Sequence, residues 1–189
     1  MNFSAVILAG GKSTRMGRDK AFLEIGGRTL LARQLQLVRT AGAGEIFISG
    51  RVGVDYSSFG CRVLTDTLLE TGPLAGIASA LATMTTPLLL VLAVDLPNMD
   101  AHFLCDLLVK SAGGTGIIPR VAGQMEPLAA TYPRAAHSLA VTKLRAGKLA
   151  VRDFVGACAA GKLVTMMDFP LETAVRFQNC NSPADLPTA

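Results

Sequence analysis

The sequence predicts an α/β fold with a mostly parallel sheet. Apolar strand patterns alternate with helical patterns along the chain, which is typical of helices packed on both faces of such a sheet. The run Leu88–Val94 is apolar at every position, as expected of an inner strand that helices cover on both sides. The chain has 189 residues, 50% of them hydrophobic, which is enough for one sizeable core and too few for two ordinary domains. We therefore expect residues 1–189 to form a single domain.

The elements expected in the first half of the chain follow from the spacing of its apolar residues. One helix is predicted from Thr29 to about Ala41, where Gly42 ends it. A second helix is predicted from Pro73 to Met84, with its proline in the first turn. Strands are expected at 3–8, 45–49, 62–64 and 88–94.

The second half of the chain continues the alternation. Asp100 is the expected N-cap of a helix that runs to about Ala112, and Ser182 is that of a short terminal helix ending at Pro187. Two further helices are expected at 133–146 and 151–159, and strands are expected at 115–119, 127–132 and 163–167.

Composition narrows the class of protein. No apolar run reaches the roughly 20 residues of a membrane span. The N-terminal apolar run has no basic region before it, so no signal peptide is indicated and we expect a cytoplasmic protein. The formal net charge is +4, but aromatic residues make up only 5% of the chain and there is no Trp, which argues against a nucleic-acid surface.

Residues that commonly hold zinc or perform covalent chemistry are scattered. His102 and His137 stand in unrelated segments, which argues against a histidine triad or a zinc site, and we interpret both as structural. The cysteines form no CxxC pair, and we expect them to be buried thiols. They are Cys61, Cys105, Cys158 and Cys180.

A glycine-rich, basic loop follows the first strand, where a parallel α/β sheet binds its ligands. Gly10 and Gly11 allow backbone N–H groups to approach an anion closely. A Walker A loop would need a further glycine where Val6 stands, and the dinucleotide motif GxGxxG does not match glycines at 10, 11 and 17. Four of the chain's 18 basic residues lie in this loop: Lys12, Arg15, Arg18 and Lys20.

Asp95 follows the strongly apolar strand directly and precedes Leu96 and Pro97. A carboxylate in this place can hold Mg²⁺ against triphosphate oxygens, since Mg²⁺ prefers one or two carboxylates together with phosphate. An aspartate at a strand end is also common as a turn residue or helix cap. From position alone, both interpretations stay open.

Several short motifs occur in a fixed order along the chain. The loop reads Leu8-Ala-Gly-Gly-x-Ser-x-Arg-Met-Gly-x-Asp-Lys20, and it is followed by Gly72-Pro-Leu-Ala-Gly76, Asp95-Leu-Pro97 and Asn179-Cys-Asn-Ser-Pro183. Together they resemble the motifs of the molybdenum cofactor guanylyltransferases, a branch of the nucleotidylyltransferase superfamily. The resemblance covers nearly the whole chain and implies a Rossmann-like three-layer sandwich. Related cytidylyltransferases tend to have Ala where Gly10 stands, so the adjacent glycines favour the guanine branch.

The resemblance also implies roles for individual residues. It gives Lys20, Arg15 and Asp95 catalytic roles and makes Asp95 the ligand of Mg²⁺. Asn179 and Asn181 are implied on the side of the acceptor. The residues implied to bind the nucleotide are Leu8, Ala9, Gly10, Gly11, Lys20, Asp66, Gly72, Gly76 and Asp95.

The implied reaction transfers GMP from GTP to the terminal phosphate of the molybdopterin cofactor. An acceptor phosphate is already ionised near neutral pH, so the reaction needs no general base. Two alternatives remain: a cytidylyltransferase acting on the same or a similar phosphate, and a catalytically silent nucleotide-binding module. The implied partners are the two substrates and, transiently, other enzymes of cofactor biosynthesis or enzymes that accept the cofactor, with no nucleic acid and no membrane.

Overall fold

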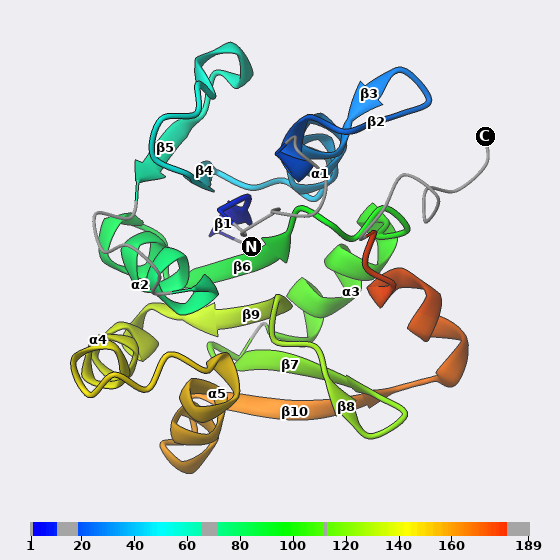
Figure 1. Cartoon of the computed structure of the whole chain (residues 1–189). Helices are drawn as coiled ribbons and strands as arrows, with labels where there is room; N and C mark the ends of the chain where they lie inside the picture. Colours follow the sequence, from blue (N-terminus) through cyan, green and yellow to red (C-terminus); the bar gives the residue numbers. More distant parts are fainter. Residues whose placement is uncertain (1, 11–18, 66–71, 112, 181–189) are drawn as a thin grey trace.

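The computed structural model describes residues 2–10, 19–65, 72–111 and 113–180 (Figure 1). Its central sheet has the strand order β5-β4-β1-β6-β9. The strands are β1 (Phe3–Leu8), β4 (Glu45–Gly50), β5 (Arg62–Thr65), β6 (Leu88–Ala93) and β9 (Ala129–Pro133). β1 pairs in parallel with both β4 and β6, and β4 pairs in parallel with β5. Only β9, at one edge, runs antiparallel to its neighbour. The prediction of a mostly parallel sheet is confirmed.

Helices cover both faces of this sheet (Figure 1). α1 (Leu30–Thr40) and α3 (Ala101–Lys110) share one hydrophobic cluster, which includes Phe3, Ala5 and Ile7 of β1. α2 (Pro73–Thr83), α4 (His137–Arg145) and α5 (Val151–Ala160) share another, which includes Val6 and Leu8. Side chains of a strand point alternately to opposite faces, so β1 supplies both cores. The predicted three-layer arrangement is confirmed.

Residues at the helix ends account for where α1 and α3 begin and for where α1 ends. The Thr29 hydroxyl accepts a hydrogen bond from the backbone N of Ala32 at 3.2 Å, which satisfies an N–H group at the start of α1. Asp100 caps α3 in the same way, accepting from Phe103 N at 2.8 Å. Beyond α1, Gly42 has φ of 88°, a left-handed conformation that favours glycine. Thr29, Gly42 and Asp100 are the residues from which the sequence predicted these helix ends.

A second, three-stranded sheet departs from the expected single sheet. It has the order β10-β7-β8 and consists of β7 (Gly116–Val121), β8 (Gln124–Met125) and β10 (Val164–Phe169). β7 lies beside β9 but is not paired with it by a backbone ladder (Figure 1). Ile117 N instead donates to the side-chain hydroxyl of Thr131 at 2.8 Å. A Cβ at Gly116 would overlap the backbone of Thr131, so glycine permits this close crossing.

Several boundaries differ from the predicted ones. The strand expected from 127 begins at Ala129, because residues 127–128 form a turn in which Ala129 N donates to Glu126 O at 3.2 Å. The helix expected from 133 begins at His137, since Pro133 ends β9 and a 3-10 helix, η3 (Arg134–Ala136), follows it. The short hairpin of β2 (Glu24–Ile25) and β3 (Arg28–Thr29) was not predicted, nor were η1 (Lys20–Phe22), η2 (Ser57–Phe59) and η4 (Leu171–Phe177). The terminal helix expected at Ser182 lies outside the described residues.

The cysteines divide into two groups. Cys158 and Cys180 are buried, as expected, and burial raises the pKa of the Cys158 thiol to about 11. The expectation was wrong for Cys105, which is exposed, and Cys61 is only half-buried. Cys105 follows the buried Leu104 on α3, but it lies on the helix face that points away from the core. Within the described part of the chain, no helix is both long and apolar enough to cross a membrane.

Candidate active site

The carboxyl ends of β4, β1 and β6 meet at one edge of the central sheet. Beyond the strands, Ala9 N donates to Ser49 O at 2.9 Å, and Val94 N donates to Leu8 O at 3.1 Å. These bonds continue the parallel ladders past the ends of the strands, so the beginning of the glycine-rich loop and the segment that carries Asp95 are held side by side. This is the edge at which parallel α/β sheets bind ligands.

Lys20 and Asp95 face each other at this edge. Nζ of Lys20 lies 3.3 Å from Oδ2 of Asp95, and the two side chains are 20% and 25% exposed. Lys20 is the first residue of η1, whose N-cap is Asp19. Asp95 follows β6 within two residues. The structure thus joins two of the three predicted catalytic residues as an ion pair that solvent can reach.

The carboxylate of Asp95 retains the capacity to bind a cation. Lys20 contacts its Oδ2 atom, whereas within the described segments no residue bonds Oδ1. Those segments contain no group of three or more His, Cys, Asp or Glu side chains that could hold a metal ion. A single carboxylate with an oxygen that no described residue bonds suits Mg²⁺, which takes one or two carboxylates and completes its shell with phosphate and water.

The second glycine motif begins α2, next to β1 and β4. Gly72 is the exposed N-cap of α2 and has φ of 67°, which few other residues adopt. Gly76 is buried, and a Cβ there would overlap the Ser49 side chain and touch Leu8. Close packing therefore accounts for Gly76, while Gly72 lies at a helix N-terminus, where backbone N–H groups favour anions. Contact of either residue with a nucleotide stays a prediction.

Leu8, Ala9 and Gly10 lead from β1 toward the site. The first two are buried, and Gly10 is exposed at the sheet edge. A Cβ on Gly10 would lie 3.7 Å from Ser49 O, which is an ordinary contact, so the fold does not require glycine there. The remaining predicted residues Gly11, Arg15 and Asp66 lie outside the described residues, as does Asn181.

The segment that follows η4 approaches Asp95. Cys180 N donates to Asp95 O at 2.9 Å, which places the exposed Asn179 next to the predicted metal ligand. Nδ2 of Asn98, in the turn after Pro97, donates to Val175 O at 3.3 Å and ties η4 to the same turn. Two elements far apart in sequence therefore meet around Asp95.

An ion pair fixes η4 against α3. Nε of Arg176 lies 2.6 Å from Oδ2 of Asp100, and the guanidinium carbon lies 5.8 Å from the centre of the Phe103 ring. Burial alone would raise the pKa of Asp100, but hydrogen bonds from Phe103 N and Arg176 outweigh it and hold that pKa below its usual value. Asp100 thus caps a helix and anchors the segment that leads to Asn179.

Sequence reasoning missed Glu126, which the fold brings to the same edge. β9 is antiparallel to β6, and Ala93 N donates to Leu128 O at 2.7 Å, so the start of β9 lies beside the end of β6. Glu126 stands two residues before Leu128 and is half-buried. Burial raises the pKa of its carboxyl group. A charged residue immediately before the apolar run of a strand was the available signal.

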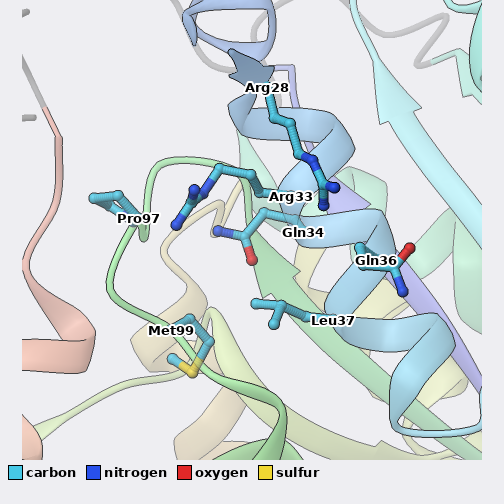
Figure 2. A pocket seen from close by; sticks show the side chains of 7 residues that line it. All are labelled: Arg28, Arg33, Gln34, Gln36, Leu37, Pro97 and Met99. Carbon is cyan, nitrogen blue, oxygen red and sulfur yellow. The ribbon is translucent and has the colours of Figure 1, made fainter. Parts of the chain in front are cut away.

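A pocket of about 210 Å³ lies behind the turn that carries Asp95 (Figure 2). Arg33 and Gln34 extend from α1 toward Pro97 in this view. Nε2 of the buried Gln34 donates to Leu96 O at 2.7 Å and so supports the backbone next to Asp95, while its Oε1 atom lacks a hydrogen-bond partner among the described residues. None of the predicted site residues that the structure describes lines this pocket. Its lining consists of Arg28, Arg33, Gln34, Gln36, Leu37, Pro97 and Met99.

The fold and the site together define a class of enzyme. A parallel α/β sandwich that places a lysine and an aspartate at the carboxyl edge, where a glycine-rich loop begins, has the arrangement expected of an enzyme that transfers a nucleotidyl group. Residues 5–161 match the family profile described as MobA-like NTP transferase domain. The chain belongs to this family, which confirms the prediction of a nucleotidylyltransferase.

Individual relatives agree with this assignment. A probable molybdenum cofactor guanylyltransferase from Opitutus terrae is 37% identical over 185 residues, which cover 96% of this chain and 92% of that protein. Molybdopterin-guanine dinucleotide biosynthesis protein A from Archaeoglobus fulgidus matches in structure with a TM-score of 0.73 at 21% identity, covering 96% of this chain and 94% of that one. The 2-C-methyl-D-erythritol 4-phosphate cytidylyltransferase from Thermus thermophilus has a TM-score of 0.73 at 22% identity, covering 98% and 95%. These two structures bear on the fold alone.

Proposed function

We propose that the enzyme transfers GMP from GTP to the terminal phosphate of the molybdopterin cofactor, forming molybdopterin guanine dinucleotide and pyrophosphate. The observation that carries the proposal is the pair of Lys20 and Asp95, 3.3 Å apart at the carboxyl edge of the sheet. The name and the 37% identity of the relative from Opitutus terrae support the choice of substrates.

Donor and acceptor would occupy separate parts of the site. The nucleotide would lie on the loop side, with its phosphates near Gly10, Gly11 and Lys20 and with Arg15 adding charge. Asp66, Gly72 and Gly76 would contact the nucleotide, and the Asp66 carboxylate suits the N–H groups of guanine. The acceptor would lie on the side of Asn179 and Asn181, where the C-terminal segment reaches Asp95.

The chemistry needs positioning and charge rather than a proton relay. An oxygen of the acceptor phosphate attacks the α-phosphorus of GTP, and the bond from that phosphorus to the oxygen bridging to the β-phosphate breaks. Pyrophosphate leaves with the bond's electron pair, so no proton has to move for the step to balance. Lys20 and Arg15 would stabilise the charge that develops on the phosphates.

Asp95 would hold Mg²⁺, since its carboxylate stands at the strand end and keeps one oxygen without a bond to any described residue. When bound, the ion would supply charge neutralisation to the α-phosphate and the departing pyrophosphate. The arrangement of one carboxylate together with substrate phosphates matches the preference of Mg²⁺.

The enzyme would act as a single cytoplasmic domain with transient contacts to other enzymes of cofactor biosynthesis or to enzymes that receive the cofactor. The deciding experiment incubates the protein with Mg²⁺, a molybdopterin-containing acceptor and either GTP or CTP, and measures pyrophosphate and dinucleotide. Product with GTP alone is the expected result. Preference for CTP would transfer the enzyme to the cytidylyl branch, and binding of GTP without product from either nucleotide would overturn the proposed reaction with this acceptor.

A further inference from the structure

Lys20 depends on its surroundings for its position. It begins η1, which has only three residues, and 3-10 helices of this length have poor hydrogen-bond geometry and little stability of their own. The sequence just before Asp19 consists of glycine, serine, threonine and basic residues, with Met16 as its one large apolar residue. The contacts that hold the ends of η1 therefore help to set where the ammonium group of Lys20 lies, together with its ion pair to Asp95.

One side chain, that of Tyr56, holds both ends of η1. Its hydroxyl donates to Oδ2 of Asp19 at 3.4 Å, and Oδ1 of Asp19 caps η1 by accepting from Ala21 N at 3.1 Å. At the other end, the ring of Phe22 stacks on the Tyr56 ring with centroids 5.8 Å apart and an interplanar angle of 21°. Lys20 lies between these two contacts.

Tyr56 is itself fixed to the central sheet. It is 1% exposed, and its hydroxyl accepts a hydrogen bond from the backbone N of Arg51 at 3.2 Å, directly after β4. Its ring lies so close to Gly50 that a Cβ there would overlap it. The guanidinium of Arg51 adds a contact of 3.9 Å to Oδ2 of Asp19. A continuous series of contacts thus leads from the end of β4 through Tyr56 to Asp19, the residue before Lys20.

We propose that Tyr56 is a positioning residue that sets Lys20 opposite Asp95 for contact with the triphosphate. The inference rests on the proposed function, because it needs Lys20 to act on the nucleotide. Tyr56 stands outside the four motifs of the sequence, and it acts through Asp19 and Phe22 without touching the substrate. A residue of this kind affects catalysis through the geometry of another residue, and small misplacements of a catalytic group are costly.

A double-mutant cycle between Tyr56 and Lys20 tests the proposal. The measured quantities are kcat/KM for GTP and the Kd of a non-hydrolysable GTP analogue with Mg²⁺, for wild type, Tyr56→Phe, Lys20→Ala and the double variant. We expect Tyr56→Phe to lower kcat/KM by about tenfold in the wild-type background. In the Lys20→Ala background the same change should have almost no effect, since there is no ammonium group left to position.

Two further variants separate positioning from general loss of stability. Tyr132→Phe is the matched control, because Tyr132 is the other buried tyrosine and its hydroxyl donates to Pro127 O at 2.8 Å, away from η1. The effect of Tyr132→Phe on kcat/KM, whatever its size, should be the same in the wild-type and the Lys20→Ala backgrounds. Phe22→Leu removes the ring stacking at a position that is 38% exposed, where substitutions usually cost little stability, and it should behave as Tyr56→Phe does.

The outcomes distinguish the inference from the proposed function. If Lys20→Ala lowers turnover and the effect of Tyr56→Phe is equal in both backgrounds, Tyr56 is merely structural and the inference is overturned, whereas the proposed function stands. If Lys20→Ala leaves GTP-dependent turnover and analogue binding unchanged, the role of Lys20 in the proposed function fails, and the inference fails with it. Loss of the Tyr56 effect only in the Lys20→Ala background supports both.

Discussion

Lys20 and Asp95 lie 75 positions apart in the sequence, yet Nζ of the lysine is 3.3 Å from Oδ2 of the aspartate. A partly exposed ion pair of this kind contributes only about 0 to 1 kcal/mol to folding. The pair therefore adds little to the stability of the fold. Its two charges suit the two parts of a metal-bound triphosphate, since the ammonium group attracts phosphate oxygens and the carboxylate attracts the cation.

Replacing Asp95 by Asn should abolish most activity without unfolding the protein. The amide keeps the size of the side chain but loses the charge that would bind Mg²⁺, and we expect Mg²⁺-dependent pyrophosphate release to fall on the order of 100-fold. The free energy of unfolding should change by no more than about 1 kcal/mol. Asp106→Asn is the control, because Asp106 forms an exposed pair with Lys110 at 3.2 Å on α3. Turnover of Asp95→Asn equal to that of the control would contradict the role of Asp95.

Two glycines of the predicted site should respond differently to substitution by Ala. A methyl group at Gly10 meets Ser49 O at 3.7 Å, so Gly10→Ala should change the free energy of unfolding by less than about 0.5 kcal/mol. It should nevertheless raise the KM for the nucleotide, since the added Cβ blocks close approach of the backbone to phosphate. Gly76→Ala forces a methyl group against Ser49 and should destabilise by about 1–3 kcal/mol. Chemical denaturation and initial rates measure both quantities, and an unchanged KM for Gly10→Ala would remove Gly10 from the binding site.

Local sequence signals account for most of the fold. β1 and β6 were predicted from apolar runs, and α3 from its cap Asp100, because each depends on residues that are neighbours in the chain. The loop after Leu8 and the strand end at Asp95 also follow from a general rule about parallel sheets. Their meeting at one edge was therefore predictable, although the distance between their side chains was not.

The features that escaped prediction depend on contacts between distant segments. The bond from Cys180 N to Asp95 O and the contacts of Tyr56 with Asp19 have no local pattern in the sequence. The separate sheet of β7 and β10 depends on how closely Gly116 crosses Thr131, which no periodicity reports. By contrast, the exposure of Cys105 was accessible from helical spacing, since its α3 neighbours Phe103, Leu104, Leu107 and Leu108 form the buried face.

Removing the Arg176 side chain should weaken binding of the acceptor more than binding of the nucleotide. Arg176 ties η4 to Asp100 at 2.6 Å, and η4 leads to Asn179 and to the bond between Cys180 and Asp95. We expect Arg176→Ala to raise the KM for the acceptor several-fold, by roughly 1 kcal/mol of lost positioning, with little change in the KM for GTP. Lys110→Ala, which breaks the exposed ion pair with Asp106 on α3, should change neither KM. Equal increases in both KM values for Arg176→Ala would show that η4 serves the whole site rather than the acceptor side.

Glu126→Gln and Glu45→Gln should change stability in opposite directions at neutral pH. Burial raises the pKa of Glu126, so its ionised form is disfavoured in the folded state, and its contribution to stability is complete below about pH 4 and is lost as pH rises through the folded pKa. At pH 7 the Gln variant should therefore unfold at a higher denaturant concentration than wild type, and the difference should shrink toward pH 4.

Glu45 should show the opposite pH dependence. Hydrogen bonds from the Ser4 hydroxyl at 2.6 Å and from Thr85 N at 2.9 Å lower the pKa of its carboxyl group. Its contribution to stability is therefore present above the unfolded pKa and is lost as pH falls through the folded pKa. Glu45→Gln should destabilise at pH 7 and less so in acid. Denaturation of the three proteins between about pH 3.5 and pH 8 measures both trends, and a Glu126→Gln curve that parallels the Glu45→Gln curve would refute the assignment of Glu126 as a carboxylate that folding desolvates.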